Sequence, residues 1–308
     1  MRTAYITHPD CLEHDTGEGH PESASRLRAI DDQLVAARLY DFLSHYEAPE
    51  VTREQLERCH DPAYLDQVEK LIPHNGYAYL DPDTVVCPQS LQAAKRAAGA
   101  VVKAVDLVMG EGEVNAFCAV RPPGHHAERM RTMGFCIYDN AAVGAAHAMA
   151  VYGFERVAIL DFDVHHGNGS EDIFRDDRRV ILCSTFQHPF YPYSAFEQSP
   201  DHIVCAPLKA TATGVEFRDA VNRLWLPALH RFKPQMIFVS AGFDAHVADE
   251  MSGVCLTEAD YTWVTEQIQA IAAEYAQNRI VSVLEGGYEP TALGRSVAAH
   301  IRVLMDLN

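Results

Sequence analysis

The sequence predicts one α/β domain spanning residues 1–308, with a doubly wound, mainly parallel sheet flanked by helices. Six short apolar runs alternate with longer segments of helical periodicity, which is the pattern of parallel strands joined by crossover helices. The strand-like runs are almost continuously apolar, which indicates that both faces of the sheet are buried. Because no linker rich in serine, glycine or proline and no repeat interrupts the chain, we expect a single domain.

The apolar runs and the periodic segments place each element. Strands are expected at Thr3–His8, Ala116–Arg121, Val157–Asp163, Val180–Thr185, Met236–Ala241 and Ile280–Leu284. Helices are expected at about residues 24–39, 53–70, 89–109, 139–152, 214–230, 257–277 and 290–306. The helix at 257–277 begins with the capping-box residues Thr257 and Asp260 and then repeats apolar residues at steps of three and four. Residues 187–200 and 245–256 are expected to be long loops, which often carry function.

The composition excludes several classes of function. Acidic residues outnumber basic ones by 43 to 25, for a formal charge of −18, so the basic surface of a nucleic-acid-binding protein is absent. The negative charge suits cationic substrates, although solubility alone also explains it. No apolar run approaches the ~18 residues of a membrane span, and the N-terminus lacks a signal-peptide pattern. Eight scattered cysteines without a C-x-x-C pair are typical of reduced thiols in a cytoplasmic protein.

Acidic and histidine side chains follow two of the expected strands, and in open α/β sheets ligands bind beyond the carboxyl ends of the strands. The third strand continues into LDFDVHHGNG, where Asp161, Asp163 and His165 would point to one side of an extended backbone. The fifth strand continues into SAGFDAH and brings Asp244 to the same rim. Aspartates at strand ends can simply cap turns, but two such groups together favour a metal site. One histidine and two carboxylates match catalytic Zn²⁺, although Fe²⁺, Mn²⁺ and Co²⁺ accept the same ligands.

A pair of histidines and a tyrosine follow two further strands. After the second strand the chain reads RPPGHHAE, whose prolines and glycine favour a tight turn that holds His125 and His126 side by side. Histidine titrates near neutrality and can both take and give a proton. After the last strand, EGGY would let Tyr288 reach the site as a hydrogen-bond donor to a developing oxyanion. A surface loop with two histidines, a second metal site and a packing role for Tyr288 are the simpler interpretations.

Together these motifs resemble the histone deacetylase superfamily, which includes acetylpolyamine amidohydrolases and acetoin-utilization proteins. RPPGHHAE, GFC, D-x-DVHHGNG, SAGFDAH and EGGY occur in the order typical of that family. GHPESASRLRAI near the N-terminus and the later HDPAY also resemble family segments, so the resemblance covers essentially the whole chain. Asn168 in HHGNG, where an acid could stand, resembles the class II branch.

The resemblance implies a zinc-dependent amide hydrolase that removes acetyl or other short acyl groups from lysine-like amines. It implies that Zn²⁺, with Fe²⁺ as an alternative, is bound by Asp163, His165 and Asp244. His126 would then be the general base and acid, and Tyr288 would polarise the scissile carbonyl. His125, oriented by Asp161, would stabilise charge.

The resemblance also implies a substrate tunnel and a structural K⁺ ion. Gly134, Phe135 and Tyr191 would form the wall of an acyl-lysine tunnel. Met251 falls about where polyamine deacetylases carry a gatekeeping glutamate, which favours acyl-lysine over acetylpolyamine substrates. A second alkali-ion site is implied near Phe174. The K⁺ ligands, partly backbone atoms, would come from Asp161, Asp163, His165 and Ser184.

Departures from the family pattern concern the rim of the pocket. PYSAFEQ follows Tyr191 where the family usually shows a PG-x-G turn, FDAHVADEMSG lacks the usual D-P-L, and Tyr288 precedes Glu-Pro rather than Asn-Leu. Other functions remain open: an acetylpolyamine amidohydrolase, an arginase-like ureohydrolase or a non-catalytic acyl-lysine binding module. A ureohydrolase would bridge two Mn²⁺ ions with extra carboxylates, so the single Asp244 argues for a mononuclear centre. The sequence leaves open the natural substrate, the acyl-chain preference, the metal used in vivo and whether the chain forms a homo-oligomer.

Overall fold

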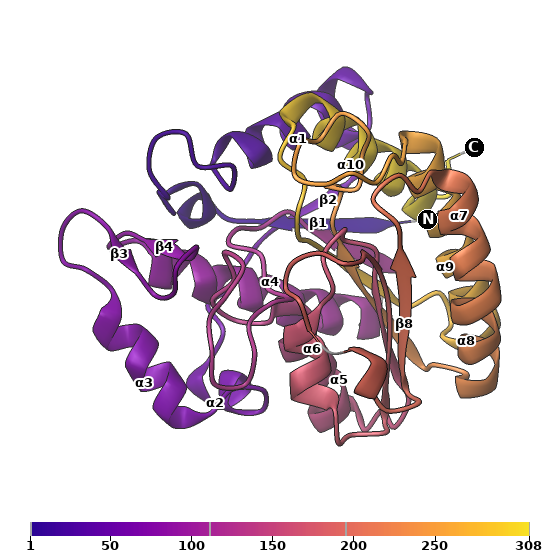
Figure 1. Ribbon diagram of the computed structural model, residues 1–308, viewed down its shortest axis with the longest axis horizontal. Helices are drawn as coiled ribbons and strands as arrows, with labels where there is room; N and C mark the ends of the chain where they lie inside the picture. Colours follow the sequence, from indigo (N-terminus) through magenta and orange to yellow (C-terminus); the bar gives the residue numbers. More distant parts are fainter. Residues whose placement is uncertain (1, 111, 195, 308) are drawn as a thin grey trace.

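A parallel sheet runs through the centre of the protein, in a computed structural model that describes residues 2–110, 112–194 and 196–307 (Figure 1). Within these residues eight strands lie in the order β2-β1-β5-β10-β9-β6-β7-β8, and each neighbouring pair is parallel. The predicted doubly wound, mainly parallel sheet is therefore confirmed. The strands are β1 (Thr3–Thr7), β2 (Ser44–Glu47), β5 (Asn115–Cys118), β6 (Val157–Asp161), β7 (Val180–Gln187), β8 (Ile203–Leu208), β9 (Met236–Ala241) and β10 (Ile280–Leu284).

Helices cover both faces of the sheet (Figure 1). Helices α4 and α5 pack together against the central strands, whereas α1, α9 and α10 form a second layer in which α10 contacts both of the others. A short antiparallel pair, β3 (Ala78–Tyr79) with β4 (Val85–Val86), lies outside the main sheet. The helices are α1 (Ser25–Ala36), α2 (Arg53–Glu57), α3 (Pro62–Leu71), α4 (Ser90–Met109), α5 (Asn140–Tyr152), α6 (Asn168–Phe174), α7 (Gly214–Ala220), α8 (Leu226–Phe232), α9 (Glu258–Tyr275) and α10 (Pro290–Leu304).

Helix α5 has almost no exposed face, because it is packed between α4 and the sheet. Its sequence, NAAVGAAHAMAVY, consists mostly of small residues that allow close approach. Gly144 lies so near Val101 of α4 and Phe238 of β9 that a Cβ atom would collide with both. This packing holds α5 against β6 and β9, the two strands whose carboxyl ends carry the candidate metal ligands.

Two predicted helices are interrupted. The segment 53–70 forms α2 and α3 rather than one helix, because Asp61 caps a new helix that begins at Pro62. Proline has no N–H to donate to the preceding turn, so it starts a helix more readily than it continues one. The segment 214–230 contains a π-helical turn, Val221–Trp225, between α7 and α8. Short 3-10 turns cover Pro9–Leu12, Tyr40–Phe42 and Phe196–Gln198.

The two outermost strands were not predicted. Strand β2 is only four residues long and alternates half-buried with exposed side chains, and β8 contains Pro207. A proline cannot donate to the hydrogen-bond ladder and is tolerated at the edge of a sheet, which is where β8 lies. Helix α6 was not predicted either, because it is only seven residues long and its first four residues, all buried, include no apolar side chain that would reveal the helical period.

Two observations bear on the predicted class of protein. The eight cysteines, all within the described residues, are free. Among the described residues, no helix combines the length and the apolar character needed to cross a membrane.

Candidate active site

The candidate site lies at the carboxyl ends of four adjacent central strands, β5, β10, β9 and β6. Strand β6 ends at Asp161 and not, as predicted, at Asp163. The backbone then turns, because Asp161 Oδ1 accepts from the N–H of Asp163 at 3.1 Å and Asp163 Oδ1 accepts from the N–H of His165 at 2.8 Å. The predicted extended backbone is therefore wrong beyond Asp161: the strand ends there, and residues 163–165 form a bend.

Asp163, His165 and Asp244 form a buried cluster of metal-ligand type. His165 Nδ1 lies 3.0 Å from Asp163 Oδ1 and 3.1 Å from Asp244 Oδ2. Asp244 Oδ2 is buried and, among the described residues, has this histidine as its one charged partner within 4 Å. A Cβ atom at Gly286 would collide with both carboxylates, so glycine at this position keeps space open beside them.

The pKa values of the side chains in this cluster indicate that it favours a bound positive charge. Burial, reinforced by the charge of Asp163, raises the pKa of Asp244 to about 6. Burial lowers the pKa of His165, but hydrogen bonds to Asp163 and Asp244 outweigh it and raise this pKa to about 10. A proton on His165 therefore holds the two carboxylates together, and a metal ion bound by the same three side chains would replace that proton.

The two adjacent histidines lie beside the cluster with different partners. Their ring centroids are 4.0 Å apart. His125 Nδ1 lies 2.9 Å from Asp161 Oδ2, and His126 Nδ1 lies 2.7 Å from Asn168 Oδ1. The predicted pairing of His125 with Asp161 is thus present in the structure. In the sequence Asn168 indicates only a resemblance to the class II branch, and its contact with His126 was not predicted.

These partners give the two histidines opposite protonation. Burial lowers the pKa of His125, but the charges of Asp161 and Asp163 outweigh it and hold this pKa well above its usual value. Burial and the neighbouring His125 and His165 hold the pKa of His126 well below its usual value. The pair therefore combines a charged imidazole with a neutral one, which is the form needed to accept a proton.

Glu285 holds the histidine loop in place, a role that the sequence did not indicate. Its Oε2 accepts from the N–H groups of Gly124 at 2.7 Å and His125 at 3.1 Å. The side chain is fully buried, which raises its pKa to about 8. The only sequence signal was its position directly after the apolar run of β10.

Tyr288 is fixed by two contacts at the end of β10. Its N–H donates to Asp249 Oδ2 at 2.6 Å, and the Arg26 guanidinium lies 4.9 Å from the centre of its ring. Arg26 Nε also donates to the carbonyl of Gly287 at 2.7 Å. Burial holds the pKa of Tyr288 well above its usual value, so the phenol stays protonated and can donate a hydrogen bond.

A narrow cavity of about 230 Å³ leads to these groups. The four residues predicted to bind substrate all line it, and two lining residues, Asp83 and Phe190, were not predicted. Gly134 packs against the His126 ring, where a Cβ atom would collide. The lining residues are Asp83, His126, Gly134, Phe135, His165, Phe190, Tyr191, Met251 and Tyr288.

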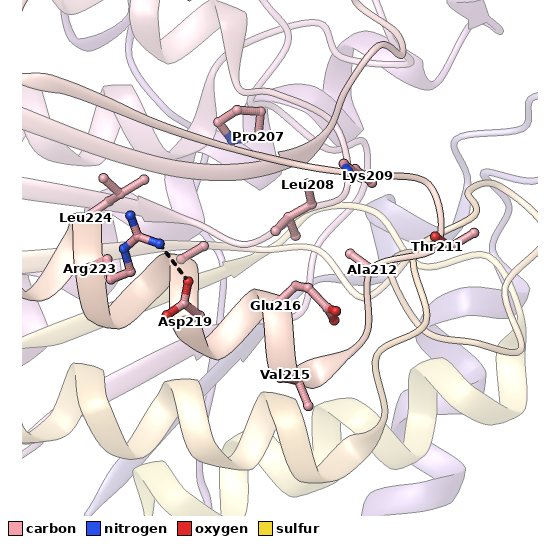
Figure 2. Close-up of a pocket in the computed structure, with 11 residues that line it drawn as sticks. Pro207, Leu208, Lys209, Thr211, Ala212, Val215, Glu216, Asp219, Arg223 and Leu224 are labelled. Atoms are coloured by element: carbon pink, nitrogen blue, oxygen red, sulfur yellow. Dashed lines mark hydrogen bonds and ion pairs between the residues drawn. The ribbon is translucent and has the colours of Figure 1, made fainter.

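A larger cavity, of about 630 Å³, lies elsewhere, along the residues that end β8 and begin α7 (Figure 2). Two of its charged side chains pair with each other, with Arg223 Nη1 3.3 Å from Asp219 Oδ2. Among its described lining residues there is no histidine or cysteine. The volume of a cavity alone therefore does not identify the active site. The smaller cavity, which is lined by His126, His165 and Tyr288, is the candidate active site.

The whole chain resembles known proteins in sequence. The model of the histone deacetylase domain matches residues 20–304. The chain belongs to the histone deacetylase family. The chain is 38% identical to an uncharacterized protein of Synechocystis, over 98% of this chain and 99% of the relative.

Relatives with more informative names support an enzymatic role for this family member. The chain is 34% identical to a histone deacetylase-like amidohydrolase of Pseudomonas aeruginosa, over 93% of the chain and 82% of the relative. It is 32% identical to a probable deacetylase of Archaeoglobus fulgidus, over 94% and 82%. The crystal structure of the HDA15 HD domain matches with a TM-score of 0.93 and 32% identity, over 99% of this chain and 90% of that one. This histone deacetylase family member is therefore a deacetylase-type hydrolase acting on amides.

Proposed function

We propose that this enzyme is a Zn²⁺-dependent hydrolase that removes acetyl or other short acyl groups from lysine-like amines. The observation that carries the proposal is the buried cluster of Asp163, His165 and Asp244, whose histidine lines the same narrow cavity as neutral His126. One imidazole and two carboxylates are a common donor set for catalytic zinc, and Fe²⁺ is the alternative. The two buried carboxylates that converge on His165 and the space kept by Gly286 fit a bound ion.

Proton transfer belongs to His126 in this proposal. Zinc, when bound, would polarise the acyl carbonyl and acidify a water molecule. Because Asn168 holds Nδ1 of His126, Nε2 is the nitrogen that takes a proton from the attacking water and returns it to the departing amine. The lowered pKa of His126 keeps this nitrogen unprotonated at neutral pH.

In this proposal His125 and Tyr288 stabilise the negative charge that develops during the reaction. His125, protonated and anchored by Asp161, lies beside the groups where negative charge develops during attack. The Tyr288 hydroxyl donates to the carbonyl oxygen as it becomes an oxyanion. One such donor contributes about 3–4 kcal/mol to transition-state stabilisation.

The cavity suits a flexible aliphatic amine. Phe135 and Tyr191 provide apolar walls for a methylene chain. Met251, an apolar and adaptable side chain, also lines the cavity, while Asp249, two residues earlier, already accepts the N–H groups of Tyr288 and Glu289. We therefore propose acyl-lysine as the preferred class of substrate and acetylpolyamines as the alternative.

Further features of the enzyme belong to the proposal. We expect residues 1–308 to act as one catalytic domain. A structural K⁺ would use oxygen atoms of Asp161, Asp163, His165 and Ser184; Asp161 and Ser184 are cross-strand partners on β6 and β7. The second alkali-ion site near Phe174, a cytoplasmic location and a homo-oligomeric state stay predictions.

The deciding experiment is hydrolysis of acyl-lysine peptides and acetylpolyamines by the purified, zinc-loaded chain. Deacetylation that depends on the metal and is abolished by His126→Ala supports the proposal. Tight binding of the peptide without turnover would instead identify a binding module. Release of urea from guanidine substrates, without amide hydrolysis, would identify a ureohydrolase.

A further inference from the structure

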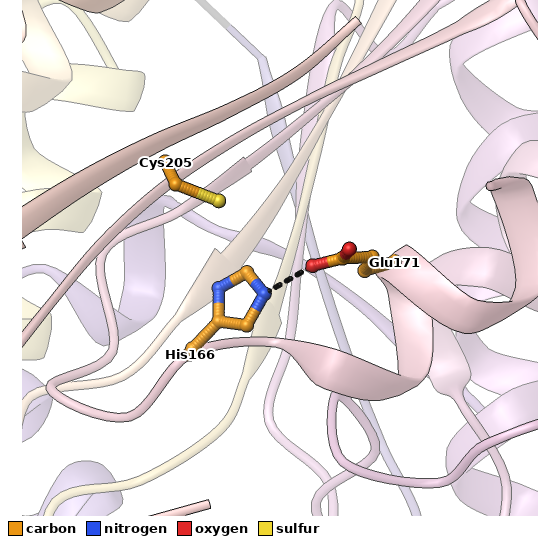
Figure 3. Close-up of side chains that lie close together, drawn as sticks. All are labelled: His166, Glu171 and Cys205. Carbon is orange, nitrogen blue, oxygen red and sulfur yellow. Dashed lines mark hydrogen bonds and ion pairs between the residues drawn. The ribbon is translucent and has the colours of Figure 1, made fainter. Parts of the chain in front are cut away.

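A second cluster of metal-ligand side chains lies next to the active-site loop in sequence. His166, Glu171 and Cys205 each offer one ligand atom, and these atoms all lie within 4.8 Å of one another. Figure 3 shows the three side chains converging from the loop after β6, from helix α6 and from strand β8. None of them belongs to the proposed catalytic cluster, which contains no sulfur.

The sheet and its neighbours hold this cluster in place. His166 Nε2 lies 2.7 Å from Glu171 Oε2, and His166 Nδ1 lies 3.0 Å from Ser184 Oγ. Ser184 of β7 and Cys205 of β8 are cross-strand partners, so their side chains project from the same face of the sheet. His166 and Glu171 are only 1% and 6% exposed, which limits the conformations that either side chain can adopt.

Groups around the cluster resemble the outer partners of a metal site. A ligating histidine usually has its second nitrogen bound to an oxygen partner, and Ser184 occupies that position. The other oxygen of Glu171, Oε1, accepts from Ser199 Oγ at 2.5 Å and Arg175 Nη1 at 2.7 Å. Burial works against ionisation of Glu171, but its hydrogen bonds hold its pKa below the usual value, so a carboxylate faces the histidine.

A simpler interpretation is a hydrogen-bonded His–Glu pair beside an unrelated thiol. The charges that these three side chains can carry favour a metal site instead. A thiolate and a carboxylate together neutralise a divalent ion, and a buried ion must be paired to be tolerated. Thiolate and imidazole are ligands that Zn²⁺ prefers, whereas Ca²⁺ and Mg²⁺ prefer oxygen alone.

We propose that His166 Nε2, Glu171 Oε2 and Cys205 Sγ bind a second divalent transition-metal ion, of the Zn²⁺ class. The site goes beyond the proposed deacetylase function and does not depend on it. A fourth position can be filled by water from a surface cavity of about 270 Å³ that Glu171 and Arg175 help to line. The 2.7 Å separation of nitrogen and oxygen must widen by roughly half an ångström to fit tetrahedral zinc.

Binding changes the protonation of two ligands. Burial and the charge of Glu171 raise the pKa of the Cys205 thiol to about 12, so the free cluster holds a neutral thiol and the ion must displace its proton to solvent. The proton of the hydrogen bond between His166 Nε2 and Glu171 Oε2 must also leave Nε2, and an imidazole bound through Nε2 carries its proton on Nδ1, from which it donates to Ser184 Oγ. The loaded site, with one thiolate, one carboxylate and one divalent ion, has no net charge.

An ion at this position would join three segments that are far apart in sequence. It would tie the edge strand β8 to helix α6 and to the loop that also carries His165. Because Asn168, the partner of His126, begins helix α6, the same ion would stiffen the support of the active site.

Cobalt titration of the metal-stripped chain tests the proposal. A thiolate bound to Co²⁺ gives a charge-transfer absorption in the near ultraviolet, which a site of carboxylates and imidazole cannot give. We expect this absorption in the wild-type chain and its loss in Cys205→Ser. The matched control is Cys255→Ser, because Cys255 is also half-buried but lies outside the cluster, and it should keep the absorption.

Metal counting separates this site from the catalytic one. We expect about two Co²⁺ per wild-type chain and about one per Cys205→Ser chain. Glu171→Gln, which preserves side-chain shape, should weaken the sulfur-containing site at least tenfold and guards against a folding defect in the cysteine variant. The proposal is overturned if the wild-type chain shows no thiolate absorption, or if the absorption survives in Cys205→Ser. Failure of the catalytic site alone would leave the thiolate absorption intact.

Discussion

Replacing Asn168 by aspartate tests how the enzyme keeps its proton-transfer histidine neutral. Asn168 Oδ1 lies 2.7 Å from His126 Nδ1, so a carboxylate there would place a negative charge within hydrogen-bond distance of the ring. An opposite charge this close raises a histidine pKa by about 1–3 units. This corresponds to about 1.4–4 kcal/mol in favour of the protonated ring.

The sign of the effect on activity follows from the role of His126. The unprotonated ring is the active form, and burial together with two neighbouring histidines lowers its pKa in the wild-type enzyme. Raising that pKa moves the acid side of the kcat/KM profile to higher pH by about 1–3 units. Activity at a pH on the acid limb of the wild-type profile should therefore fall much more than activity on its plateau.

A second contact must be controlled. Asn168 Nδ2 donates to Glu128 Oε1 at 2.8 Å, so aspartate at this position would also bring two carboxylates together. The double variant Asn168→Asp with Glu128→Gln removes that repulsion and should show the same shift of the acid limb. The assay is kcat/KM for an acetyl-lysine peptide across pH, with metal content measured in each sample. An unchanged acid limb in both variants, with metal retained, would refute the assignment of His126 as the base.

Further predictions concern the ligands, the substrate and stability. His126→Ala should abolish turnover and keep about one metal ion in the catalytic site, since the ring lies beside the ligands; loss of that ion would mark His126 as a ligand. Asp163→Ala or Asp244→Ala should lose the catalytic metal and activity, and stoichiometric metal in either variant would contradict the ligand set. Acetyl-lysine peptides should exceed acetylspermidine in kcat/KM at least tenfold, about 1.4 kcal/mol, and the reverse ratio would identify a polyamine enzyme. Arg121→Met should cost about 3–5 kcal/mol in denaturant unfolding, because it breaks the buried pair with Glu22 and leaves that carboxylate only the more distant Arg26 and His14 as partners. The exposed ion-pair variant Arg178→Met should cost less than about 1 kcal/mol, and equal losses would contradict the buried pairing.

Much of the fold could be predicted because burial leaves a simple pattern in sequence. The central strands β6, β9 and β10 are covered on both faces, so they read as continuous apolar runs. Strands β2 and β8 lie at the edges of the sheet, where partial exposure and Pro207 break that pattern. The split of segment 53–70 at Asp61 depends on a local cap that competes with helical periodicity.

In the candidate site, too, some residues could be predicted from the sequence and others could not. Asp163, His165 and Asp244 could be proposed because acidic and imidazole groups directly after apolar runs are unusual. The roles of Glu285 and Asn168 were not predicted, because they depend on which loop lies opposite each residue in the fold. Those contacts join residues more than forty positions apart, with Glu285 bonded to Gly124 and Asn168 bonded to His126, and nothing in the local sequence reports them.

The position of β10 has a consequence for how the protein is made. It is the last of the described strands to be synthesised, yet it lies between β5 and β9 in the middle of the sheet. Until it emerges from the ribosome, the two halves of the sheet present open, apolar edges that can pair with other chains. We expect nascent chains arrested before Ile280 to be held by chaperones or to aggregate, and the four-strand rim that carries the active site to form only after β10 has been synthesised.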